Sequence, residues 1–74
     1  MEIRLQATFV DPANLELITR LTEDPDFDWP VELAVADTSA GAFTVVGSPE
    51  DVADALDQIE HRYDAGVAEY RINH

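Results

Sequence analysis

The chain has 74 residues, and its 16 acidic side chains outnumber its four basic ones so far that the formal net charge is −12 at pH 7. This length suits one domain with a modest hydrophobic core, so residues 1–74 are treated as a single unit. The absence of cysteine excludes a disulfide scaffold and thiolate chemistry. So acidic a chain lacks the basic face that nucleic-acid binding requires, and we expect no direct nucleic-acid partner.

The distribution of charge and hydropathy also bears on location. No apolar run is long enough to cross a bilayer, and Met-Glu-Ile-Arg does not start like a signal peptide, so we expect a cytoplasmic protein without a membrane partner. All four basic residues are arginine, and the acids are spread along the whole chain. This is typical of halophilic proteins, whose carboxylates hold water and cations while salt screens their repulsion. The alternative is an acidic surface that binds a partner or mimics nucleic acid.

The first half of the chain predicts a strand, a helix and a second strand. Residues 2–10 alternate between apolar and polar side chains, as in a half-buried strand. Asp11–Pro12 is a helix start signal, and the apolar spacing after it predicts a helix that ends near residues 22–24. Residues 31–37 alternate again and lead into turn residues at 38–41, which predicts a hairpin.

The second half repeats the order strand, helix, strand. Residues 42–47 form the returning strand of the hairpin. Ser48–Pro49 is a second helix start signal, and apolar residues recur at helical spacing as far as Tyr63. We expect Gly66 to end this helix in the left-handed conformation. Residues 67–73 then form the last strand. Its core-facing residues are expected to be Ala68, Tyr70 and Ile72.

The predicted order is therefore β-α-β-β-α-β. Right-handed crossovers place both helices on one face of a four-stranded antiparallel sheet. This arrangement is an α+β, ferredoxin-like plait with strand order 4-1-3-2. The first strand is then central, and the last strand lies at an edge.

The helix-free side of this sheet, which we call the open face, offers the first candidate site. Its predicted residues are Arg4, Gln6, Thr8, Glu32, Ala34, Ala36, Ala42, Thr44, Val46, Val67, Glu69 and Arg71. Arg4 and Arg71 would lie on neighbouring strands, where they can bind a small anion or a partner's carboxylates. The interpretation that we favour is that they pair with Glu2, Glu32 and Glu69 across strands. The small side chains also leave room for a second copy of the chain.

Other candidate sites fail on residue type or number. The Asp-x-Asp-x-Asp spacing of residues 24–28 resembles the start of an EF-hand loop, but Trp29 and Val35 stand where that loop needs Gly and Glu. His61 and Asp57 supply only two metal ligands, which makes a weak site. No catalytic triad or phosphate-binding glycine loop is visible. We therefore expect no catalytic residues, no metal site and no cofactor.

The turn after the first strand carries a resemblance to a known family. Val10-Asp11-Pro12-Ala13-Asn14-Leu15 is similar to the Asp-x-x-Gly-Leu turn of ACT-type regulatory domains, with Asn14 in place of the glycine. The layout of elements is similar over nearly the whole chain. The resemblance implies a small regulatory domain that binds amino acids or similar effectors at a dimer interface, where the turn approaches the effector.

These observations lead to three functional hypotheses. The first is a non-enzymatic interaction or regulatory module that binds another protein or self-associates through the open face or an edge strand. The alternative is an ACT-like domain that binds an amino acid or another small anion through Arg4, Arg71, Asp11 and Asn14. A small enzyme ranks last, because no nucleophile or base constellation stands out.

Overall fold

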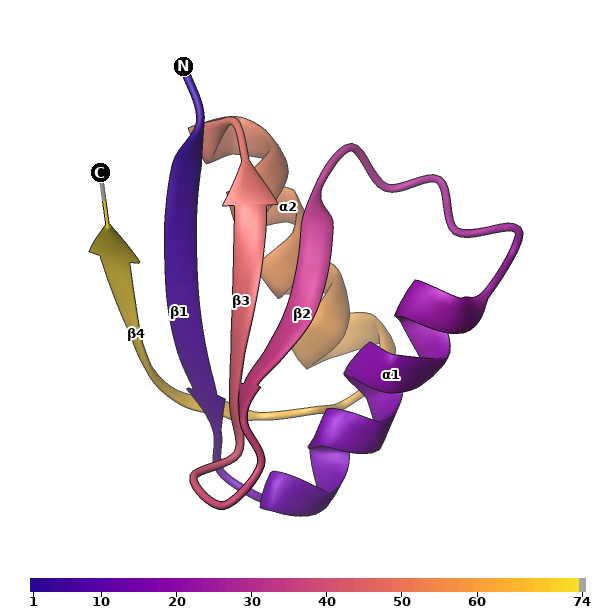
Figure 1. Cartoon of the computed structure of the whole chain (residues 1–74), viewed down its shortest axis with the longest axis vertical. Helices are drawn as coiled ribbons and strands as arrows, with labels where there is room; N and C mark the ends of the chain where they lie inside the picture. Colours follow the sequence, from indigo (N-terminus) through magenta and orange to yellow (C-terminus); the bar gives the residue numbers. More distant parts are fainter. Residues whose placement is uncertain (74) are drawn as a thin grey trace.

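The computed structural model describes residues 1–73 and has the expected order of elements (Figure 1). Its strands are β1 (Ile3–Phe9), β2 (Glu32–Asp37), β3 (Ala42–Gly47) and β4 (Val67–Asn73). Its helices are α1 (Leu15–Glu23) and α2 (Pro49–Asp57). A 3-10 turn, η1 (Pro12–Asn14), precedes α1, and a π-helical segment, η2 (Gln58–Arg62), continues α2. The strands pair antiparallel in the order β2-β3-β1-β4, which confirms the ferredoxin-like α+β fold.

Both helices pack against the same face of the sheet and bury one hydrophobic core. Alternate residues of β1 and β3 point into it, because successive side chains of a strand face opposite sides. The buried residues of the core cluster are Ile3, Leu5, Ala7, Phe9, Leu15, Ile18, Leu21, Val31, Leu33, Phe43, Val45, Val52, Ala55, Ile59 and Ala65. Phe9 and Phe43 stack at its centre with 4.4 Å between ring centroids. Phe27 and Trp29 are half-buried and pack against this cluster.

The start signal at Ser48 works as the sequence predicts, whereas Asp11 caps the 3-10 turn η1, and α1 begins only at Leu15, after Asn14, whose side chain makes no cap bond. The Ser48 hydroxyl accepts a hydrogen bond from the Asp51 backbone N–H over 3.2 Å, which satisfies one of the free donors at the start of α2. A carboxylate oxygen of Asp11 accepts one from the Ala13 N–H over 3.0 Å at the start of η1. A proline follows each cap at the first helical position, where its missing N–H costs nothing.

The end of the second helical segment differs from expectation. The prediction that Gly66 takes the left-handed conformation was wrong, because Asp64 takes it instead with φ of +54°. The chain leaves η2 through two backbone bonds wider than those of an α-helix: Tyr63 N–H donates to Gln58 C=O and Ala65 N–H donates to Ile59 C=O, each over 3.2 Å. The wide π-helical turn therefore closes two residues earlier than a glycine cap would have placed it.

Strand β4 lies beside β1 at the margin of the sheet, and neither helix lies over it (Figure 1). Tyr70 is opposite Ala7 and Ile72 is opposite Leu5, so both lie on the helix side as expected. The predicted side is therefore correct for both residues, but their side chains are 61% and 48% exposed and are not buried in the core.

The start of β4 is also displaced relative to the expected alternation. Thr8 pairs with Glu69, but the next residue, Phe9, pairs with Val67, so Ala68 is an extra residue in a β-bulge. Val67 consequently packs against the core rather than on the open face, and Ala68 is exposed. Val67 therefore lies on the opposite side of the sheet from the one that simple alternation predicts.

Candidate functional site

The register of the central strands places Arg4 and Arg71 on the same face of the sheet. Gln6 lies opposite Arg71, and Gln6 and Arg4 are two residues apart on β1, so all three side chains point to the open face. Arg4 and Arg71 are therefore diagonal neighbours, with about 7 Å between positions of this kind. Both side chains are exposed.

Neither arginine is neutralised within the part of the chain that the structure describes. Among residues 1–73, the one contact between a basic and an acidic side chain joins His61 Nδ1 to Asp57 Oδ1 over 3.0 Å, on an exposed helix face, and involves no arginine. The favoured expectation that Arg4 and Arg71 pair with acids across the strands was therefore wrong. The acids expected as their partners were Glu2, Glu32 and Glu69. Within residues 1–73, neither guanidinium group is within ion-pair distance of an acidic side chain.

Arg71 borders a shallow hollow of about 230 Å³ on the open face. Gln6 and Thr8 form part of its lining, and two acidic residues, Glu69 and Asp37, also border it. The Asp37 carboxylate is held by the Ser39 hydroxyl over 2.7 Å and by the backbone N–H groups of Ser39 and Ala40. These bonds, the hydroxyl bond foremost, lower the pKa of Asp37, so a negative charge is fixed at the rim.

The Asp11–Asn14 turn lies far from the two arginines. Asp11 follows Arg4 by seven residues along an extended strand, which corresponds to about 20 Å. The Asp11 carboxylate already caps η1, and Asn14 faces a different depression on the helix side. The structure therefore brings Arg4 and Arg71 together but separates them from Asp11 and Asn14. One small ligand would not span both positions.

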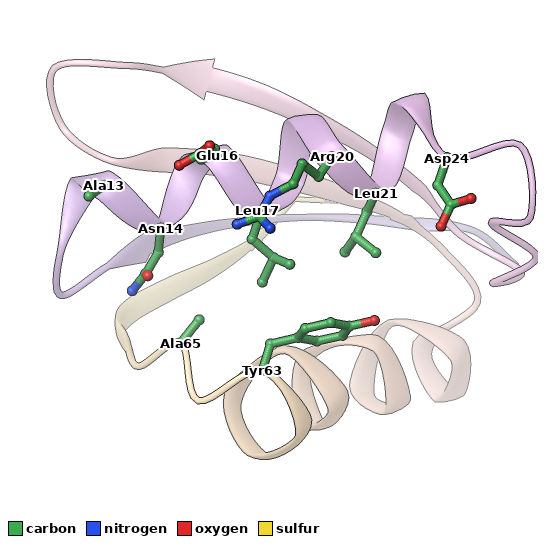
Figure 2. Close-up of a pocket in the computed structure, with 9 residues that line it drawn as sticks. All are labelled: Ala13, Asn14, Glu16, Leu17, Arg20, Leu21, Asp24, Tyr63 and Ala65. Atoms are coloured by element: carbon green, nitrogen blue, oxygen red, sulfur yellow. The ribbon is translucent and has the colours of Figure 1, made fainter.

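That second depression is a groove of about 500 Å³ between α1 and the segment that follows η2 (Figure 2). Tyr63 lies across it beneath Leu17 and Leu21, and the Arg20 side chain extends toward it from α1 (Figure 2). Its lining residues are Ala13, Asn14, Glu16, Leu17, Arg20, Leu21, Asp24, Tyr63 and Ala65. Leu17, Leu21 and the Tyr63 ring are the large nonpolar groups of the lining, and α1 also contributes the charged residues Glu16, Arg20 and Asp24, an arrangement that suits a small amphipathic molecule.

The sequence pattern did not reveal this groove. Its two walls come from residues 13–24 and 63–65, so only the packing of α1 against the end of η2 brings them together. Tyr63 was identified as part of an apolar helical stripe, which is what a core residue would show. Its side chain is instead 40% exposed, with the Arg62 guanidinium carbon 5.7 Å and the Trp29 ring centroid 6.4 Å from the centroid of its ring.

The outer side of β4 forms a third exposed feature. In the order β2-β3-β1-β4, β4 has β1 on one side and no strand on the other. An edge strand presents unpaired backbone N–H and C=O groups to which another strand can bond. Beside them lie two large exposed apolar side chains, Tyr70 and Ile72, on the helix side, and Glu69 and Arg71 on the open face.

Comparisons with other proteins leave the topology as the only guide to relationship. No protein-family profile matches the chain, and neither a curated protein nor a solved structure is significantly similar to it. Among the described residues, no three His, Cys, Asp or Glu side chains are grouped so that they could hold a metal ion. No helix within residues 1–73 has the length and hydropathy of a membrane span.

Proposed function

We propose that this chain is a non-enzymatic interaction module that self-associates, and that the exposed edge strand β4 is its contact surface. The observation that carries the proposal is the pair Tyr70 and Ile72, which stay 61% and 48% exposed although both lie on the helix side of the sheet. Apolar side chains beside an unpaired strand edge favour association. The open face is a less favourable contact surface for self-association, because charged and hydroxyl side chains cover much of it.

Strand β4 has few of the features that prevent an exposed edge strand from pairing with another chain. Lysine and proline, which commonly blunt an exposed edge, are absent from it, and its bulge at Ala68 leaves the following residues, 69–73, regularly paired with β1. The strongly negative charge opposes the approach of two copies at low salt, whereas molar salt screens charges beyond about 3 Å. We therefore expect association to be strongest in concentrated salt.

The test is the oligomeric state in molar KCl. Sedimentation or light scattering over a range of protein concentrations should show a mass that rises toward that of a dimer. Tyr70→Ser should lower the dimer fraction without unfolding the chain, because Tyr70 is mostly exposed. Val35→Ser is the matched control, since Val35 is a partly exposed apolar residue on the opposite edge strand, β2. A protein that is monomeric at every concentration and salt would refute self-association.

A second candidate function is the binding of an amino acid or another small anion, as the ACT-like layout implies. The groove between α1 and Tyr63 supports it, because Arg20 there has no ion-pair partner among the described residues and Asn14 of the family-like turn lines it. A chemical-shift titration with a panel of amino acids and carboxylates should then move the resonances of Leu17, Arg20 and Tyr63. Unmoved resonances at those three residues across the panel would reject this function.

A further inference from the structure

The side chains of β4 are complementary to themselves when the strand is reversed. Glu69 and Arg71 flank Tyr70 at equal distances along the strand and lie on the open face, while Tyr70 lies on the helix side. If two copies of β4 run antiparallel with Tyr70 opposite Tyr70, each Glu69 lies directly opposite the partner's Arg71. Opposite charges and aromatic side chains in directly opposed positions both stabilise an antiparallel pair.

Charge discriminates this register from its neighbours. A two-fold axis perpendicular to the sheet keeps the open faces of both copies on the same side. Directly opposed residues must then point to the same face, which happens only when one residue lies opposite its own copy. Centring it on Glu69 places Glu69 opposite the partner's Glu69, and centring it on Arg71 places two arginines opposite each other. Like charges in opposed positions destabilise a strand pair. Only the register centred on Tyr70 pairs each charge with its opposite.

We infer that the partner at β4 is a second copy of this chain, paired antiparallel with Tyr70 on the two-fold axis. The inference rests on the proposed function and adds to it the partner and the register. Arg71 makes no ion pair within its own chain among the described residues, so it is free to meet the partner's Glu69. Beyond β4, Figure 1 shows no helix or strand that would obstruct a second sheet. The product is a continuous eight-stranded sheet with all four helices on one side.

A charge-swap series at moderate salt tests the register. Glu69→Arg and Arg71→Glu should each weaken dimerisation roughly tenfold, because each variant opposes like charges at two symmetric positions. The double variant E69R/R71E again places opposite charges across from each other at both positions, so it should recover the wild-type dissociation constant. Glu23→Arg is the matched control, because Glu23 is exposed at the end of α1 and changes net charge as much as Glu69→Arg does. It should not weaken the dimer.

Cross-linking supplies an independent readout, because the chain has no cysteine of its own. Tyr70→Cys should form an intermolecular disulfide on mild oxidation, since opposed residues in an antiparallel pair have Cα atoms about 5 Å apart. Ile72→Cys should not, since the two copies of residue 72 are offset by four residues, or about 13 Å along the strands. Both substitutions are at exposed side chains, so both variants should fold.

The outcomes separate the inference from the proposed function. Rescue in the double variant together with cross-linking at position 70 supports the register. A dimer that persists in all the charge variants, or that cross-links at position 72 rather than 70, overturns the register but leaves self-association intact. A wild-type protein that never dimerises overturns both.

Discussion

Gly47 lies so close to Val31 that a Cβ atom at position 47 would come within 2.9 Å of Val31 Cγ1. The same atom would be 3.2 Å from the Pro30 carbonyl oxygen. Val31 is buried and β-branched, so it has little freedom to move aside. We expect Gly47→Ala to lower the free energy of unfolding by about 1–3 kcal/mol, as overpacking does. Chemical denaturation monitored by circular dichroism measures this change.

Gly66 supplies the matched control for that substitution. A Cβ atom there would meet only Val10 Cγ2, at 3.6 Å, and Gly66 is not in the left-handed region. Gly66→Ala should therefore leave stability unchanged or raise it by up to about 1 kcal/mol, because it restricts the unfolded chain. Equal losses at both positions would contradict the packing explanation.

Asp64 offers a route to higher stability. It holds φ of +54°, a conformation that disfavours residues other than glycine by roughly 1–2 kcal/mol, less for Asp and Asn. We expect Asp64→Gly to raise the free energy of unfolding by about 1 kcal/mol. Asp64→Asn removes the same negative charge but keeps a side chain, so the difference between the two variants isolates the backbone effect. Thermal melts that rank the Asp64→Asn variant level with or above the Asp64→Gly variant would show that the backbone is not the cause.

The hydrogen bonds at Asp37 predict a specific pH dependence. Because the Ser39 hydroxyl holds the pKa of Asp37 below its ordinary value of 3.8, the folded state favours the ionised carboxylate. This contribution to stability is present above pH 3.8 and is lost as the pH falls through the lower pKa of the folded state. Ser39→Ala should raise the pKa of Asp37 in an NMR titration of its carboxyl carbon. Thr38→Ala is the neighbouring control and should leave it unchanged.

Salt should stabilise the monomer itself. With a formal net charge of −12 and no arginine ion pair among the described residues, repulsion between carboxylates is poorly compensated within the chain. Raising KCl from low to molar concentration screens this repulsion, so the thermal midpoint should rise strongly. A variant with Glu16→Gln, Asp28→Asn and Asp54→Asn, all at exposed positions, should gain less from salt. A midpoint indifferent to KCl would contradict the halophilic interpretation.

The order of elements could be predicted from the sequence because each element carries its own local signal. Local signals of this kind are the alternation in residues 3–9 and the caps at Asp11 and Ser48. Each depends only on neighbours within a few positions, so it can be read without knowledge of the tertiary structure. Strand order followed from chirality rules that apply to any β-α-β-β-α-β chain. The shared face of Arg4 and Arg71 followed from the same alternation and was confirmed by the strand register.

Features that depend on how elements pack against each other, such as which strand residues a helix covers, could not be predicted. Alternation identifies the side to which Tyr70 points, but not whether a helix extends far enough to cover it. The bulge at Ala68 moves Val67 to the helix side, and no proline or glycine inside the strand predicts it. Residue type favours Gly66 as the left-handed residue, but the hydrogen bonds of the π-helical turn place that conformation at Asp64, and these bonds cannot be read from the sequence.

The opposite margin of the sheet determines how far an assembly of this chain can grow. The ladder between β2 and β3 shifts register between Val35 and Asp37, and acidic residues stand at both ends of β2, Glu32 and Asp37. An interrupted, charged margin is a poor template for a further strand. Joining two copies at β4 uses its regular stretch, residues 69–73, and leaves at both outer margins the strand β2, whose regular stretch covers only residues 32–35. We therefore expect assembly to stop at a closed pair, so that even concentrated solutions stay free of fibrils.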